Sequence, residues 1–80
     1  MLIFKLENIL EELGITKNHL SRESKVRSST IYDLASGKTK RLELDTIKSI
    51  LDYLNQLANS KDINKVYTID DLVKYVMVVG

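Results

Sequence analysis

Side chains that carry a positive charge or a hydroxyl group are concentrated in one segment of this sequence, Thr16–Arg41. The segment contains seven basic and two acidic residues, a net charge of +5, whereas the remaining residues carry five lysines and nine acids, a net charge of −4. The overall charge of +1 is therefore the sum of one basic segment and an acidic remainder. Because such side chains bind anions and donate hydrogen bonds, we expect one positively charged face directed at a partner. The alternative is an ordinary mixed surface.

Residues suited to catalysis or metal binding are scarce in this chain. It contains one histidine, His19, and no cysteine, which excludes a disulfide and a cysteine-based metal site. Its three glycines are too widely spaced for a loop that cradles phosphate. Asp70 and Asp71 are adjacent, so on a helix they would not face each other, and they are better suited to complement a helix dipole. We therefore predict that the chain is not an enzyme and uses no cofactor or metal.

Two short helices joined by a tight turn are predicted within the basic segment, at Lys17–Ser24 and Ser28–Ser36. The inward positions of these helices and the turn between them hold the apolar residues Leu20, Val26, Ile31 and Leu34. Ile31 and Leu34 are three residues apart and share one helical face. The second helix thus has an apolar back and a polar front, so it can pack by one face and offer the other to a partner.

Capping residues define the expected ends of both helices. Thr16 can accept a backbone N–H at the start of the first helix, and His19 occupies the position where a capping box would place an acid. Ser28 is expected to cap the second helix, with Arg27 just outside it. Gly37 is expected to end that helix.

Further elements are expected on both sides of this helix pair. Met1–Lys5 alternates in polarity and should be extended, whereas Leu6–Leu13 has one apolar helical face and should end at Gly14. An amphipathic helix is predicted at Leu44–Ala58, with Glu43 as its N-cap. Its inward stripe consists of Leu44, Ile47, Ile50, Leu51, Leu54 and Leu57.

The C-terminal part is expected to begin with a polar loop at Asn59–Lys65. Thr68 and the acids after it indicate a capped helix, which we predict at Ile69–Tyr75. The β-branched run Val76–Val79 should form a strand. It would pair with Leu2–Lys5, either within one chain or across a dimer. A position at the core edge or in a dimer contact is expected for Tyr53, Tyr67 and Tyr75.

Length and hydropathy predict one small domain, residues 1–80. The expected fold class is mainly α, with four or five helices and, as an option, a short terminal two-stranded sheet. No stretch approaches the roughly 20 apolar residues of a membrane span, and the run Met1–Phe4 is too short for a signal peptide. We therefore expect a cytoplasmic protein with no membrane contact.

The spacing of the helix pair resembles the helix-turn-helix of the Cro/phage-repressor (XRE-like) family of transcriptional regulators. The positions of the family pattern hold Lys17, Leu20-Ser21, Lys25-Val26, Ile31 and Gly37, and the resemblance covers about Leu6–Leu57. Three positions depart from the pattern, because Ser21 replaces the usual alanine, Ser24 an apolar residue and Lys25 a glycine. A left-handed conformation at Lys25 would cost about 1 kcal/mol or more. The resemblance implies a compact repressor-like domain.

The same resemblance implies sequence-specific binding to double-stranded DNA, with about residues 28–36 as the recognition helix in the major groove. The candidates for base contacts are Ser28, Ser29, Tyr32 and Asp33. The candidates for phosphate contacts are Lys17, Asn18, Arg27, Thr30, Lys38, Thr39, Lys40 and Arg41. Asp33 is the weakest base candidate because a carboxylate repels phosphate, and it could instead pair with Arg22 or Lys38.

The resemblance further implies a homodimer that represses transcription by occupying a pseudo-palindromic site, as is usual in this family. Two other hypotheses remain open. In the first, the chain is an antitoxin-type regulator that also binds a partner protein through its valine-rich C-terminal tail. In the second, the same fold serves as a protein-interaction module whose basic face meets an acidic partner.

Overall fold

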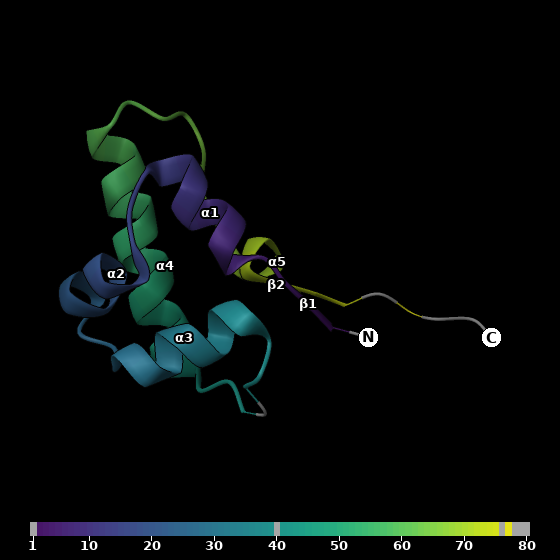
Figure 1. Cartoon of the computed structure of the whole chain (residues 1–80). Coiled ribbons are helices and arrows are strands. Elements are labelled where there is room, and N and C mark those ends of the chain that lie inside the picture. The colour runs from purple at the N-terminus through teal and green to yellow at the C-terminus, as the bar shows by residue number, and fades with distance from the viewer. Residues whose placement is uncertain (1, 40, 76, 78–80) are drawn as a thin grey trace.

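The structure, a computed structural model, describes residues 2–39, 41–75 and 77. Its elements are, in chain order, β1 (Leu2–Phe4), α1 (Leu6–Leu13), α2 (Lys17–Ser24), α3 (Ser28–Ser36), α4 (Leu44–Ser60), α5 (Ile69–Leu72) and β2 (Val73–Tyr75). The two strands form an antiparallel sheet in which Ile3 pairs with Lys74. The prediction of a mainly α fold with a short terminal sheet is therefore confirmed (Figure 1).

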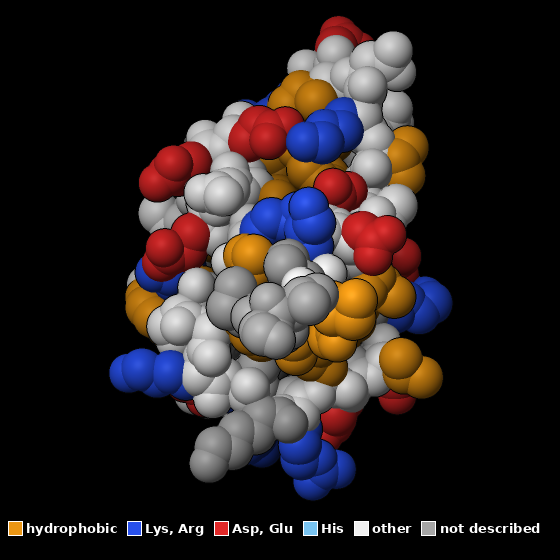
Figure 2. Space-filling model, turned by 90° about the vertical axis from the view of Figure 1, so that its right-hand side faces the viewer, with side chains coloured by type: hydrophobic (Ala, Val, Ile, Leu, Met, Phe, Trp, Pro, Cys, Tyr) orange, Lys and Arg blue, Asp and Glu red, His pale blue; other side chains and the backbone are white. Residues whose placement is uncertain are grey.

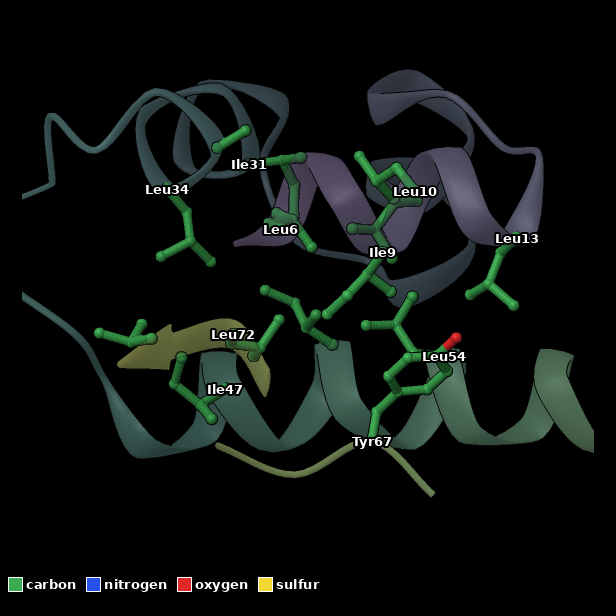
Figure 3. Close-up of a cluster of buried hydrophobic side chains, with 14 of the residues drawn as sticks. Leu6, Ile9, Leu10, Leu13, Ile31, Leu34, Ile47, Leu54, Tyr67 and Leu72 are labelled. Atoms are coloured by element: carbon green, nitrogen blue, oxygen red, sulfur yellow. The ribbon is translucent and has the colours of Figure 1, made fainter. Parts of the chain in front are cut away.

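One cluster of buried apolar side chains joins all five helices. It includes four residues from α1 and three from α3, and it lies between these two helices and α4 (Figure 3). The members are Leu6, Ile9, Leu10, Leu13, Leu20, Ile31, Leu34, Ala35, Ile47, Ile50, Leu54, Ala58, Tyr67, Leu72 and Val73. The predicted inward residues Leu20, Ile31 and Leu34 are at most 2 % exposed, and Val26 packs half-buried against the cluster.

The C-terminal end of α3 is determined by Gly37 and by contact with the N-terminal strand. Gly37 has φ +76°, a left-handed conformation that glycine adopts without steric penalty. The next amide, of Lys38, donates to the carbonyl of Asp33 over 2.9 Å, which closes the helix end. A Cβ atom at Gly37 would lie 3.3 Å from Cδ2 of Phe4, so this glycine also allows β1 to approach α3 closely. The predicted helix ends at Gly14 and Gly37 are confirmed.

The C-terminal helix and strand differ from the prediction. The helix ends at Leu72 rather than at Tyr75, and the strand occupies Val73–Tyr75 rather than Val76–Val79. The physical reason is competition for backbone groups. The amide of Lys5 donates to the carbonyl of Leu72 over 2.8 Å, and β1 then pairs with the residues that would have continued the helix. The sheet forms within one chain. Of the predicted strand, Val76 and Val78–Val79 lie outside the described residues.

The long helix α4 also departs from its predicted face and length. Leu44, expected to point inward, is 81 % exposed because it is the first residue of the helix and lies beyond the edge of the core. Ile47, Ile50 and Leu54 are buried as predicted, Leu51 and Leu57 pack partly buried against the core, and Ala58 joins the inward stripe. The helix extends to Ser60, since polar residues on an exposed last turn do not break it. Among the described residues, no helix is long and apolar enough to cross a membrane.

Candidate nucleic-acid interface

The turn between α2 and α3 accommodates the three residues that depart from the family pattern. Lys25 adopts φ +60° and ψ 29°, the left-handed conformation predicted for it. The hydroxyl of Ser24 donates to the carbonyl of Leu20 over 2.6 Å, and that of Ser21 donates to the carbonyl of Val26 in the turn. The hydroxyl of Ser24 therefore binds the backbone within α2, whereas that of Ser21 ties α2 to the turn that follows it.

Helix α2 is anchored at its start and against α4. Thr16 caps the helix as predicted, because its Oγ1 accepts the amide of His19 over 3.0 Å. The ring of His19 turns to α4, where its Nε2 lies 2.7 Å from the hydroxyl of Tyr53 in a hydrogen bond. Partial burial raises the pKa of Tyr53 above its ordinary value. These contacts fix the position of α2, and with it the angle at which α3 is presented.

The outer face of α3 gathers the four predicted base-contacting residues. They are exposed, with Tyr32 46 % exposed, whereas Ile31, Leu34 and Ala35 on the opposite side are buried. Residues i, i+1, i+4 and i+5 of a helix lie on one side of it. The structure therefore presents Ser28, Ser29, Tyr32 and Asp33 together on one accessible surface.

The N-terminus of α3 corrects one prediction. Ser28 is already helical, and the residue in the N-cap position is Arg27, whose side chain makes no capping hydrogen bond. The reason is that Lys25 and Val26 complete the turn, so the helix begins one residue earlier than a serine cap requires. The first amides of α3 thus have no side-chain acceptor, and an N-terminus of this kind attracts anions.

Basic side chains surround this surface. Lys25, Arg27, Lys38 and Arg41 are exposed, and they take part in none of the ion pairs formed by the described residues. A groove between the turn, α3 and the start of α4 brings Arg27, Thr30, Thr39 and Arg41 together, beside the acids Glu43 and Asp45. Lys40, a further predicted phosphate contact, lies outside the described residues.

Two predicted phosphate contacts are engaged within the protein. Lys17 forms an ion pair with Glu7 of α1, with Nζ 2.9 Å from Oε1, and its ammonium lies 5.1 Å from the ring centroid of Tyr32. The hydrogen bond to Glu7 raises the pKa of Lys17 above 10.5. Asn18 accepts a hydrogen bond from the hydroxyl of Tyr32 over 3.4 Å. Asp33, in contrast, forms no ion pair with Arg22 or Lys38, all of which the structure describes.

Glu7 and Tyr53 position this surface from other helices; Glu7 was not predicted to do so, and Tyr53 was expected at the core edge, where it lies, but not as a partner of His19. Local patterns place Lys17 and His19 on their own helix and give neither a partner on another helix. A weak signal exists for Glu7, since it follows the inward Leu6 by one position and so lies at the edge of the packed face of α1. For the pair of His19 and Tyr53, which are 34 residues apart, no local pattern could have given the contact.

Two short helices joined by a tight turn, with an exposed polar face on the second, define a helix-turn-helix domain. A model of the Cro/C1-type HTH DNA-binding domain family matches residues 5–56. The chain therefore belongs to this family of DNA-binding regulators of transcription, as the resemblance implied. Searches of curated proteins and of solved structures returned no match.

Proposed function

We propose that the protein represses transcription by placing α3 in the major groove of double-stranded DNA. The observation that supports this most is the outer face of α3, where Ser28, Ser29, Tyr32 and Asp33 are exposed while the opposite side lies in the core. The major groove is about 12 Å wide and admits one α-helix. Occupation of a promoter by the protein would block access of polymerase.

The proposed contacts fall into two groups. Ser28, Ser29 and Tyr32 would meet base edges, and Asp33 could accept a hydrogen bond from the amino group of cytosine. The flanking phosphates would be bound by Lys17, Asn18, Arg27, Thr30, Lys38, Thr39, Lys40 and Arg41. Phosphate contacts position the protein without reading sequence, whereas the base contacts carry the specificity.

We further propose that two copies bind one pseudo-palindromic site, with half-site centres about 34 Å apart. The face that carries the terminal sheet supports this, because apolar side chains lie open there beside charged ones (Figure 2). The exposed apolar residues of β1, β2 and α5 are Leu2, Ile3, Tyr75 and Ile69. Sedimentation at several protein concentrations tests this, and a monomer at all of them, with and without DNA, would contradict it.

The first test is an anisotropy titration of genomic fragments, including the region upstream of the protein's own gene, at about 50 and 200 mM salt with competitor DNA. Selective binding of one fragment at both concentrations is expected. Binding that is uniform across fragments and disappears at the higher concentration would contradict a sequence-specific regulator.

The division of roles is tested with variants of Lys38 and Arg41, which follow α3 in the chain, and of Ser29 in α3. Arg41→Ala and Lys38→Ala should each weaken binding to every sequence and flatten the slope of log affinity against log salt by about 0.9. Ser29→Ala should leave this slope unchanged and alter the preference between sites. Lys61→Ala removes an exposed lysine beyond the far end of α4 and is the matched control. If Arg41→Ala and Ser29→Ala behave alike, the proposed roles are wrong.

A protein partner is the second candidate, and the exposure of Tyr75 and Met77, 69 % and 70 %, favours it. An antitoxin-type regulator would use this C-terminal surface to hold its partner while α3 binds DNA. Co-purification with the product of a neighbouring gene, lost on Tyr75→Ser but retained on Arg41→Ala, is the expected result. Retention of the partner by Tyr75→Ser would contradict this surface.

A further inference from the structure

The ion pair between Glu7 and Lys17 connects α1 to the start of α2, at one end of the DNA-binding surface. Oε1 of Glu7 lies 2.9 Å from Nζ of Lys17, and the side chains are 57 % and 28 % exposed. Both groups are thus accessible to solvent. The carboxylate of Glu7 therefore already pairs with the Lys17 ammonium, the group that a DNA phosphate approaching the N-terminus of α2 would bind.

The same pair adjoins a side chain of the recognition helix. The ammonium of Lys17 lies 5.1 Å from the ring centroid of Tyr32, and both residues line one surface hollow with Glu7. The hydroxyl of Tyr32 donates to Asn18, which follows Lys17 in the chain. Glu7 is therefore placed where it acts on the DNA-binding surface through Lys17, without belonging to the helix-turn-helix itself.

We propose that Glu7 competes with DNA phosphate for the Lys17 ammonium, and thereby limits the sequence-independent part of the protein's DNA affinity. This inference rests on the proposed function, because it requires that the surface formed by α2 and α3 binds DNA. It assigns to α1 an electrostatic role in binding, in addition to its contribution to the core.

The consequence can be measured because a phosphate contact contributes to salt dependence only when it releases a counterion. Each full contact steepens the slope of log affinity against log salt by about 0.9. Lys17 is already neutralised by Glu7, so it contributes less than one full contact. Removal of the carboxylate frees the ammonium, and the gain applies to every DNA sequence, because phosphates are the same in all of them.

The experiment is a double-mutant cycle of Glu7→Gln and Lys17→Gln, measured by anisotropy on a short random-sequence duplex between about 50 and 200 mM salt. Glu11→Gln is the matched control. Glu11 lies one turn further along α1, is exposed, and takes part in none of the ion pairs among the described residues. Because Glu11 lines the same hollow as Lys17, it reports the effect of removing a nearby negative charge without breaking the ion pair. Thermal melting verifies that all variants are folded.

Glu7→Gln should bind the random duplex more tightly than Glu11→Gln at the lower salt concentration. Its slope should steepen by up to about 0.9, so that its affinity falls by as much as an additional 3.5-fold between the two concentrations. Lys17→Gln alone should flatten the wild-type slope by clearly less than 0.9. Introduced into Glu7→Gln, the same substitution should abolish the gain.

Two results would overturn the inference while leaving the proposed function intact. In the first, Glu7→Gln matches Glu11→Gln in affinity and slope. In the second, Lys17→Gln flattens the slope by the full value of about 0.9 in the wild-type background. Glu7 would then not reduce the contribution of Lys17 to phosphate binding. A wild-type protein that binds no duplex DNA at either salt concentration would instead contradict the proposed function, and the inference would fail with it.

Discussion

The two ends of α4 adjoin regions that use their polar side chains in opposite ways. At the C-terminal end, polar groups bind other parts of the protein. Asn55 donates to the carbonyl of Tyr67 over 3.0 Å and accepts its amide over 2.6 Å, and Tyr67 donates its hydroxyl to Glu12 over 3.1 Å. Lys65 pairs with the same carboxylate and lies 5.0 Å from the ring centroid of Tyr67.

At the N-terminal end of α4, the turn and α3 leave their cations without internal partners. Lys25, Arg27, Lys38 and Arg41 are exposed and form no ion pair among the described residues. The charged residues of one region thus serve the fold, whereas those of the other are free for a ligand.

The largest effect is expected from Asn55→Ala. The substitution leaves both backbone groups of Tyr67 without their side-chain partner, and the free energy of unfolding should fall by about 2–3 kcal/mol. Urea denaturation measures this. DNA affinity of the folded variant should equal that of the wild type, with Gln56→Ala as a neighbouring exposed control. A stable variant with weakened DNA binding would contradict the division between the two regions.

The free energy of unfolding of the wild type, relative to that of Tyr67→Phe, should fall by about 2 kcal/mol between pH 10 and 12. Burial, aided by the hydrogen bond to Glu12, raises the pKa of Tyr67 to about 12. Because the unfolded phenol ionises near pH 10, the stabilisation is complete below that pH and is lost as the pH rises towards 12.

Denaturant titrations at several pH values measure this effect. The wild type should be about 1 kcal/mol more stable than Tyr67→Phe at neutral pH, because the phenylalanine variant lacks the hydrogen bond. This difference should shrink and then reverse between pH 10 and 12. A constant difference over this range would show that the hydroxyl is not held by the core.

A comparison of Lys25→Gly with Lys25→Ala should separate the backbone strain at position 25 from the loss of the lysine charge. Glycine removes the penalty of the left-handed conformation, so this variant should be roughly 1 kcal/mol more stable than Lys25→Ala in thermal melts. Both variants lack the ammonium and should lose DNA affinity equally. Equal stability of the two variants would mean that the turn relaxes in solution.

The smallest effect is expected from Lys48→Ala. Lys48 pairs with Asp52 over 2.8 Å on the exposed side of α4, with both side chains at least 66 % exposed. The hydrogen bond to Asp52 raises the pKa of Lys48, but solvent screens such pairs, so the melting temperature should stay within experimental error. A drop comparable to that of Asn55→Ala would show that surface pairs also support the fold.

Much of the helix-turn-helix followed from local signals in the sequence. The apolar spacing of Leu20, Ile31 and Leu34, the cap at Thr16 and the glycine at position 37 act within one or two helical turns of the residues that they control. The left-handed conformation of Lys25 was suggested instead by the family resemblance, because the family pattern has glycine at this position. The polar face of α3 followed from its apolar back, although its contacts with DNA remain a prediction.

Other features depended on which segments meet in space. The strand lies at Val73–Tyr75 because β1 pairs with that stretch, whereas valine content alone pointed further along the chain. Leu44 has an apolar side chain typical of the core, but it is the first residue of α4 and lies beyond the edge of the core. Propensity and periodicity could not decide either case, because both depend on residues distant in sequence.

The sequence by itself therefore determined the two helices, the cap of the first at Thr16, the end of the second at Gly37 and the charge of the segment that contains them. Only the tertiary structure decided that Lys17 pairs with Glu7 and that His19 reaches Tyr53. The physical reason is the range of the interactions. Helix periodicity and capping act between neighbours in the chain, whereas an ion pair or a buried contact requires two helices to be packed first.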